Sequence, residues 1–236
     1  MGYGFYYFDY TYFIFMIPAL LVTMYAQFKV KSTFSKYSGI MTRRGMTGAQ
    51  AAESVSHNGG AFGVRTRMIA GNLTDNFDPR TNIISLSQDV YSSTSVAAVG
   101  VAAHEAGHSI QNAEDYLPNR IRTALVPVTN IGSRLSMPLI IIGLILPVQF
   151  DAVVYIGIAM YALVVLFQLA TLPVEFNASM RAVKALDSSQ ILYPDELEGA
   201  KKVLRAAAMT YLAASFTAIM SLLRLLIIAS GRRRND

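Results

Sequence analysis

The sequence predicts a mainly α-helical membrane protein with about four transmembrane helices and a polar region that contains a small β-sheet. Of its 236 residues, 53% are hydrophobic and only 15% are charged, which is too apolar for an ordinary soluble domain. The mean hydropathy is +0.38, and the apolar residues gather in long uncharged segments. The net charge of +5 comes from basic residues that flank these segments instead of forming one patch with aromatics. This pattern favours a lipid bilayer as the partner and argues against nucleic acid.

Residues 1–28 are expected to form the first transmembrane helix. The segment Tyr10–Phe28 is uncharged and long enough to cross a bilayer, and several tyrosines lie at its start, where membrane proteins carry an aromatic belt. Lys29, Lys31 and Lys36 follow directly. Because cytoplasmic flanks carry the excess of basic residues, we expect the N-terminus outside the cell membrane and the next region in the cytoplasm.

Residues 29–122 are expected to form a soluble region with a small β-sheet. Thr47 is a typical N-cap for a short helix. Phe62–Ile69 and Asn82–Leu86 have the composition of strands, whereas Gly71–Thr81 is rich in Gly, Asn, Asp and Pro and is expected to be a loop. The aspartates of this loop are expected to shape turns and not to bind a metal. The absence of cysteine excludes disulfides and thiolate metal sites.

The most informative segment is Ser95–Gln111, which reads SVAAVGVAAHEAGHSIQ and contains His104, Glu105 and His108 in the order His-Glu-x-x-His. Its small apolar residues and its lack of proline predict a helix. Two imidazoles four residues apart lie on one face of a helix and can bind one zinc ion, while Glu105 can act as general base on a water at that ion. The two histidines interrupt an apolar helix, where they would be costly without a partner.

A catalytic zinc site usually takes a third protein ligand, and two carboxylates compete for that role. Glu114 follows His108 at the spacing that metzincins use for their third ligand, but Gln111 stands where those sites need the glycine at which the chain turns back. Glu175 follows a long apolar run and is expected to open an amphipathic helix, which is a suitable platform for a remote ligand. We therefore favour Glu175 over Glu114.

Residues 123–174 are expected to form a transmembrane hairpin. Leu135–Phe150 is apolar but short for a span, and it becomes long enough when the preceding stretch is recruited. Ala152–Val174 is uncharged and long enough on its own. If the short loop between the two spans lies outside, both ends of the hairpin return to the cytoplasm. This topology puts Glu175 on the same side of the membrane as the two histidines.

Residues 175–205 are expected to contain the helix of the third ligand and a cytosolic loop. In residues 206–236, the uncharged segment Ala206–Leu223 precedes the basic tail Arg232–Arg234. If this segment spans the bilayer, the tail lies outside, against the usual distribution of basic residues, whereas a re-entrant or surface-lying helix would remove the conflict. The basic residues of 175–205 outnumber the tail, so we favour a span.

These motifs resemble the neutral zinc metallopeptidases of bacterial membranes, the YugP-like family. The matching segments are spread through most of the chain and are Tyr25–Phe34, Leu73–Arg80, Val99–His108 and Leu172–Ser179. More distantly, the chain is similar to the HtpX-like and CAAX prenyl endopeptidases. In those families a Glu in a Glu-Phe-x-Ala-Asp type segment is the third zinc ligand, and the resemblance implies that role for Glu175. Ser179 stands where those families have the Asp.

Residues and resemblance together predict a multi-pass membrane endopeptidase with a cytosolic, gluzincin-like metalloprotease domain that acts on peptide or protein substrates. His104, His108 and Glu175 are the expected ligands of Zn²⁺, and Glu105 is the expected general base. Two alternatives stay open. A site-2-type intramembrane protease would embed the zinc helix in the bilayer and use a later Asp as ligand, and a zinc-stabilised membrane scaffold would have no activity.

Two expectations concern the substrate. A donor to the oxyanion is normally needed, and Asn177, Arg181 and Tyr193 are weak candidates. The strand at Asn82–Leu86 precedes the zinc helix by a few residues. If it is an edge strand, an extended substrate could bind to it by strand addition.

Overall fold

The computed structural model describes residues 10–232 and divides the chain into two compact units. Unit 1 is built from Met1–Tyr25, Ala124–Leu169 and Leu212–Asp236, and unit 2 from Ala26–Thr123 and Ala170–Tyr211. Each unit is therefore assembled from segments that are distant in the sequence. The first nine residues of the predicted N-terminal segment and the last two arginines of the basic tail lie outside the described residues.

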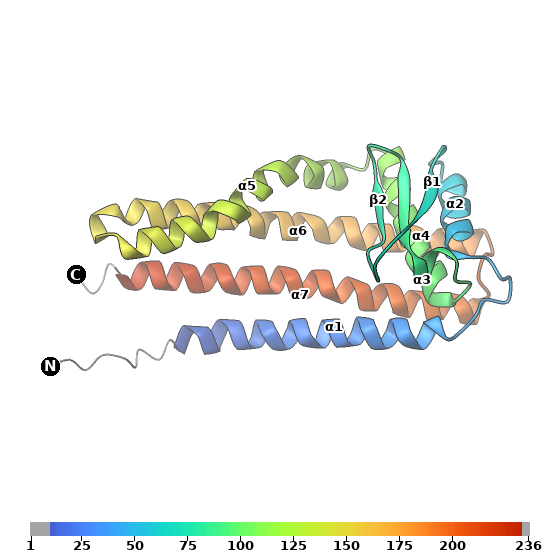
Figure 1. Ribbon diagram of the computed structural model, residues 1–236, viewed down its shortest axis with the longest axis horizontal. Helices are drawn as coiled ribbons and strands as arrows, with labels where there is room; N and C mark the ends of the chain where they lie inside the picture. The colour runs from blue at the N-terminus through green and yellow to red at the C-terminus, as the bar shows by residue number, and fades with distance from the viewer. Residues whose placement is uncertain (1–9, 233–236) are drawn as a thin grey trace. The chain divides into compact units, whose positions relative to one another are not determined.

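Four long helices form the framework, which confirms the predicted number of membrane spans (Figure 1). They are α1 (Ile17–Ser38), which continues the π-helical turn η1 (Tyr12–Met16), α5 (Leu117–Ile145), α6 (Asp151–Ser188) and α7 (Pro194–Arg232). Each of the four is long and apolar enough to cross a bilayer. Together with the small sheet, they make this a mainly α-helical membrane protein, as expected.

Two of these helices are longer than the sequence suggested. The third-ligand helix does not begin at Glu175, because α6 continues through Pro173 without interruption. Helix α7 likewise passes Arg224 without a break. A re-entrant segment would require the chain to turn back within the apolar stretch, and α7 has no such turn.

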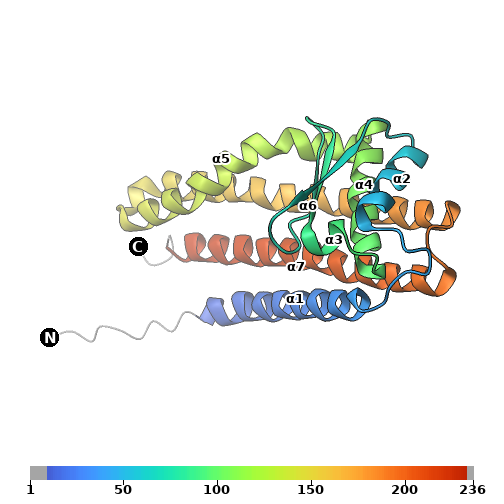
Figure 2. The ribbon, with the colours of Figure 1, turned by 45° about the vertical axis from the view of Figure 1, so that its right-hand side comes forward.

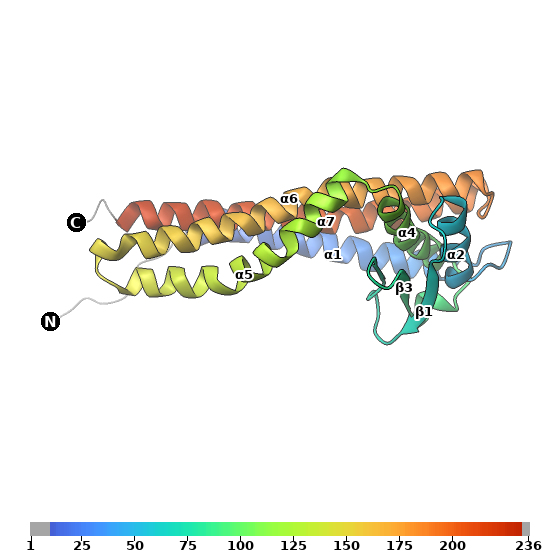
Figure 3. The same cartoon turned by 90° about the horizontal axis from the view of Figure 1, so that it is seen from above.

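Unit 1 contains the hairpin of α5 and α6, which are joined by the short 3-10 turn η2 (Val148–Phe150) (Figure 3). The two helices approach closely, since a Cβ atom on Gly143 would lie 2.6 Å from Val154 Cγ2. The end of α7 is tied to this turn by Arg232, whose Nε lies 3.2 Å from Asp151 Oδ1. The same guanidinium donates to the carbonyls of Gly143 and Leu146. At least one basic residue of the C-terminal tail thus has a structural role.

Unit 2 contains a three-stranded sheet in the order β1-β3-β2. Figure 2 shows the region of the sheet beside α3 and α4. Strand β3 (Ile83–Ser87) pairs in parallel with β1 (Arg65–Ile69) and antiparallel with β2 (Asn76–Asp78). The expectation that 82–86 forms an edge strand is wrong, because both sides of β3 are already paired. The error arose because β2 lies in the segment expected to be a loop, where Asn, Asp and Pro are poor strand formers.

The helix of the His-Glu-x-x-His motif, α4 (Val96–Ala113), begins where a polar side chain caps it. The Ser95 hydroxyl accepts a hydrogen bond from the Ala98 N–H, 3.2 Å away. Helix α2 (Gly48–Asn58) begins at the expected Thr47, which forms a capping box with Gln50. The short helix α3 (Gln88–Tyr91) follows β3 directly.

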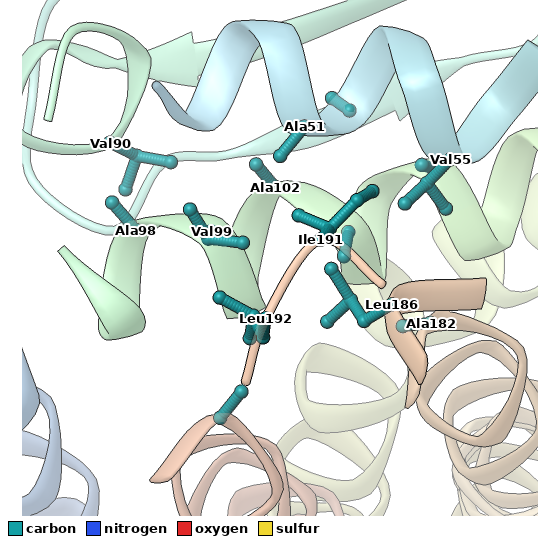
Figure 4. Packing of buried hydrophobic residues seen from close by; sticks show 14 of the residues in the cluster. Ala51, Val55, Val90, Ala98, Val99, Ala102, Ala182, Leu186, Ile191 and Leu192 are labelled. Carbon is teal, nitrogen blue, oxygen red and sulfur yellow. The ribbon is translucent and has the colours of Figure 1, made fainter. Parts of the chain in front are cut away.

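The core of unit 2 surrounds α4 (Figure 4). Val99 and Ala102 of α4 are fully buried, together with Val55 of α2 and Leu186 of α6. Ile191, in the connection between α6 and α7, completes the contact. Because the α4 side chains are small, neighbouring elements come close to its backbone. Helix α4 is therefore held from several sides, which fixes its two histidines.

We expect Arg232→Met to lower the melting temperature of the purified protein in detergent. The substitution leaves the carbonyls of Gly143 and Leu146 without the guanidinium, at a cost on the order of 1–3 kcal/mol. Arg120→Met is the control, since the pair of Arg120 with Asp115 is largely exposed. Equal melting temperatures for the two variants would contradict the role assigned to Arg232.

Candidate metal centre

The site depends on a close approach between α4 and α6. A Cβ atom on Gly107 would lie only 2.4 Å from the carbonyl oxygen of Ala178, so no other residue fits there without moving one helix. Ala178 and Ala182 on α6 are fully buried in the same contact. Small residues on both helices thus allow their backbones to touch, and side chains that flank the contact are brought together.

His104, His108 and Glu175 meet beside this contact. The Nε2 atoms of His104 and His108 lie 3.2 and 3.4 Å from the same carboxylate oxygen, Glu175 Oε2. One ligand atom from each residue can be chosen so that all three lie within 4.8 Å of one another. The structure therefore brings the remote carboxylate favoured from the sequence to the histidine pair.

The other nitrogen of each imidazole has its own partner. His104 Nδ1 lies 3.1 Å from the Ser179 hydroxyl, and His108 Nδ1 lies 3.0 Å from Gln111 Oε1. The Gln111 amide is fixed in turn, because its Nε2 donates to the Val174 carbonyl at 2.8 Å. An Oε1 acceptor requires His108 to carry its proton on Nδ1, which leaves the Nε2 lone pair facing the centre.

This donor set fits a zinc ion. Two neutral imidazole nitrogens and one carboxylate oxygen are the ligands found in many catalytic zinc sites, which keep another position open. The partners of the Nδ1 atoms supply the outer hydrogen bonds that such ligands normally have.

Glu105 follows His104 in α4 and is 8% exposed. Burial raises the pKa of its carboxyl group, and the neighbouring imidazoles of His104 and His108 oppose this rise. A carboxylate with a raised pKa is a stronger base than one in water. Its position one residue after His104 makes it the candidate base at this centre.

Two residues that the sequence did not indicate also contact Glu175. Arg122, near the start of α5, places Nη1 3.5 Å from Glu175 Oε1, the oxygen that faces away from the imidazoles. The Tyr211 side chain of α7 lies beside Glu175 and interacts with its carboxylate. Neither residue belongs to a recognisable motif. Tyr211 lies in an apolar segment, where the simplest interpretation of a tyrosine is packing.

The competing residues have other partners. Glu114 caps the end of α4 and pairs with Arg181 at 2.7 Å, which lowers the pKa of the Glu114 carboxyl group. Asn177 accepts a hydrogen bond from Arg181 Nε at 2.7 Å, and the Tyr193 ring lies 4.1 Å from the Arg43 guanidinium. None of the three oxyanion candidates is therefore directed at the histidines by these contacts.

The aspartates of the 71–81 segment hold the local chain, as expected. Asp75 Oδ1 accepts a hydrogen bond from the Ser87 N–H at 2.8 Å, and Asp78 Oδ1 accepts one from the Arg80 N–H at 3.0 Å. Both contacts join neighbouring parts of the β-sheet region.

Comparison with known proteins adds independent findings. The family described as "Putative neutral zinc metallopeptidase" matches residues 12–230. The protein named "Putative membrane protease YugP" from Bacillus subtilis (strain 168) is 40% identical over 225 residues, which cover 94% of this chain and 99% of that protein. No solved structure matches this chain significantly.

We expect Gly107→Ala to reduce the zinc content of the purified protein. Alanine favours the helix over glycine by about 1 kcal/mol, so the substitution does not weaken α4 itself. A lower zinc content must therefore come from the added methyl group, which forces α4 away from α6. Gly100→Ala is the matched control on the same helix, because its Cβ would lie 3.3 Å from Ala200 Cβ of α7. Metal analysis of both variants is the measurement, and full zinc occupancy in Gly107→Ala would contradict the packing argument.

Proposed function

The chain belongs to the neutral zinc metallopeptidase family, and from this membership we propose that it is a gluzincin-like endopeptidase that hydrolyses peptide bonds at the membrane–cytosol boundary. One observation carries the proposal. The imidazole nitrogens of the His-Glu-x-x-His helix and an oxygen of Glu175 converge, with their ligand atoms within 4.8 Å of one another.

In this proposal His104, His108 and Glu175 hold the zinc ion. Bound zinc supplies an acidified water and a positive charge beside the scissile carbonyl. Ser179 and Gln111 keep the two imidazoles oriented through their Nδ1 atoms. Arg122 faces the second oxygen of Glu175 and limits its rotation. The protein thus contributes a preset ligand geometry.

Glu105 acts as general base and then as general acid. Its carboxylate takes a proton from the attacking water and later gives it to the leaving amine. Burial beside the two imidazoles supports this role, because it raises the pKa of the carboxyl group and makes the carboxylate a stronger base. A structural zinc site has no need of this carboxylate, which disfavours the inactive scaffold.

Tyr211 is the proposed donor to the oxyanion. Its side chain interacts with the Glu175 carboxylate, so it lies next to the point where the imidazoles converge. An O–H donor in that place can stabilise the negative charge that develops on the substrate carbonyl oxygen. This role replaces Arg181 and Tyr193, which pair with Glu114 and Arg43, and Asn177, whose amide oxygen accepts hydrogen bonds from Arg181 and Gln111.

The apolar halves of the four helices, gathered in unit 1, are the proposed membrane-embedded part. Helix α6 leaves unit 1 at Leu169 and carries Glu175 on the next turns, about 9 Å further along its axis. The lysines after the first apolar segment support a cytoplasmic position for unit 2. These features favour catalysis near the cytoplasmic membrane surface.

A site-2-type mechanism is less well supported. Among the described residues, α4 is not one of the helices that could cross a bilayer. The carboxylate beside its histidines is a glutamate from the following hairpin, and not an aspartate.

We expect Glu105→Gln to retain zinc and to lose peptidase activity by about 10²–10⁴-fold. The amide has the same shape but cannot accept the proton. Cleavage of casein or a peptide by the purified protein, together with metal analysis, makes the test, and chelation should abolish the wild-type activity. Undiminished cleavage by Glu105→Gln would remove the catalytic assignment, and a wild-type protein that binds zinc without cleaving any substrate would favour the scaffold.

We expect Tyr211→Phe to lower kcat by about 10²–10³-fold while zinc content and KM change little, because the hydroxyl acts mainly in the transition state. Tyr193→Phe is the matched control, since its ring lies against Arg43. A drop in zinc content that accounts for the lost activity of Tyr211→Phe would assign the hydroxyl to ligand positioning instead.

A further inference from the structure

A cavity of about 440 Å³ lies in unit 2 between α1 and α7. Four basic side chains line it, Lys29 and Lys36 from α1 and Lys202 and Arg205 from α7. Tyr37, Ala206 and Met209 form the apolar wall of its lining, to which Ser32 and Thr33 add hydroxyl groups. The cavity therefore combines cationic side chains with an apolar wall.

Regular spacing on both helices produces this arrangement. Lys29 and Lys36 are two turns apart and lie on one face of α1, while Lys202, Arg205 and Met209 lie on one face of α7. The two helices touch at one end of the cavity, where a Cβ atom on Gly199 would lie 2.7 Å from the Tyr37 ring. The basic side chains of the two faces are therefore held around a common space.

The protein offsets the positive charge of the cavity only in part, because the carboxylate that interacts with Arg205 and Lys202, that of Glu198, also interacts with Lys201. Across residues 10–232, no carboxylate forms an ion pair with Lys29, Lys36, Lys202 or Arg205. The acidic residue Glu198 lies on the same helix, but it pairs with Lys201 at 2.6 Å. Like charges around one cavity repel each other, and a bound anion would relieve that repulsion.

The positions of these residues along the chain indicate which class of anion the cavity would bind. Lys29 is the first charge after the apolar segment Tyr10–Phe28, and Arg205 is the last before the apolar segment Ala206–Leu223. If both helices cross the bilayer, as the proposed membrane placement requires, the four cations lie at the level of the lipid headgroups. Met209 and Ala206 then lie on the side of the acyl chains.

We propose that this cavity binds the phosphate group of an anionic phospholipid. The lysines and Arg205 contact the phosphate, and the apolar wall accepts the first part of the lipid chains. The site rests on the proposed membrane placement and not on the assignment of the metal ligands. A lipid bound there would hold α1 against α7. The connection between α6 and α7, whose Ile191 packs in the core of unit 2, directly precedes this part of α7.

The test measures the melting temperature of the purified full chain in a neutral detergent while phosphatidylglycerol or phosphatidylcholine is added. We expect phosphatidylglycerol to raise it and phosphatidylcholine to have little effect. In the double variant Lys202→Gln with Arg205→Gln, the apparent affinity for phosphatidylglycerol should fall on the order of thirtyfold. The matched control, Lys31→Gln with Lys184→Gln, removes the same charge from outside this cavity and should behave like the wild type.

Three outcomes would overturn the proposal. Equal losses in the two double variants would show a general effect of net charge. A rise produced equally by glycerol 3-phosphate would assign the site to a soluble phosphate ester and not to a lipid. An unchanged melting temperature with phosphatidylglycerol would remove the site altogether. Unaltered helix content by circular dichroism checks that the variants fold, and none of these readouts depends on peptidase activity.

Discussion

The contact between Gly107 and Ala178 is the constraint on which the site depends. At this point α4 meets the backbone of α6 with no room for a side chain. His104 and His108 flank Gly107 on one helix, while Glu175 and Ser179 flank Ala178 on the other. A wider spacing would leave Glu175 Oε2 out of reach of both Nε2 atoms, which now lie 3.2 and 3.4 Å away. Helix packing by small residues thus determines the metal geometry.

Much of the architecture could be predicted from the sequence, because long apolar segments, caps and a helical histidine pair are local signals. Thr47 and the four long helices are examples. Strand β2 could not be found, since its polar residues form a strand only through pairing with β3. The continuity of α6 was also missed, because Pro173 normally signals a helix boundary, whereas here packing holds the chain helical on both sides of it.

The site shows the same division between local and tertiary information. The positions of His104, Glu105 and His108 follow from one helix, and Glu175 could be selected from its sequence context. The partners of these residues could not be predicted, because Gln111, Ser179, Arg122 and Tyr211 acquire meaning only from the packing of α4, α5, α6 and α7. Ser179 illustrates this point. Its hydroxyl contacts His104 Nδ1. A neutral oxygen therefore serves His104 at the position where the distantly similar families have an Asp.

The unbroken course of α6 links the carboxylate at the histidines to the apolar residues that precede it in the same helix. Each residue of a helix turns the chain by about 100°. The direction in which Glu175 points around the axis of α6 therefore depends on the number of residues in the apolar half. One inserted or deleted residue in that half would rotate the carboxylate away from the imidazoles or force the apolar face to turn in the lipid. The number of residues in this segment therefore matters to the site as directly as the identity of the ligand does.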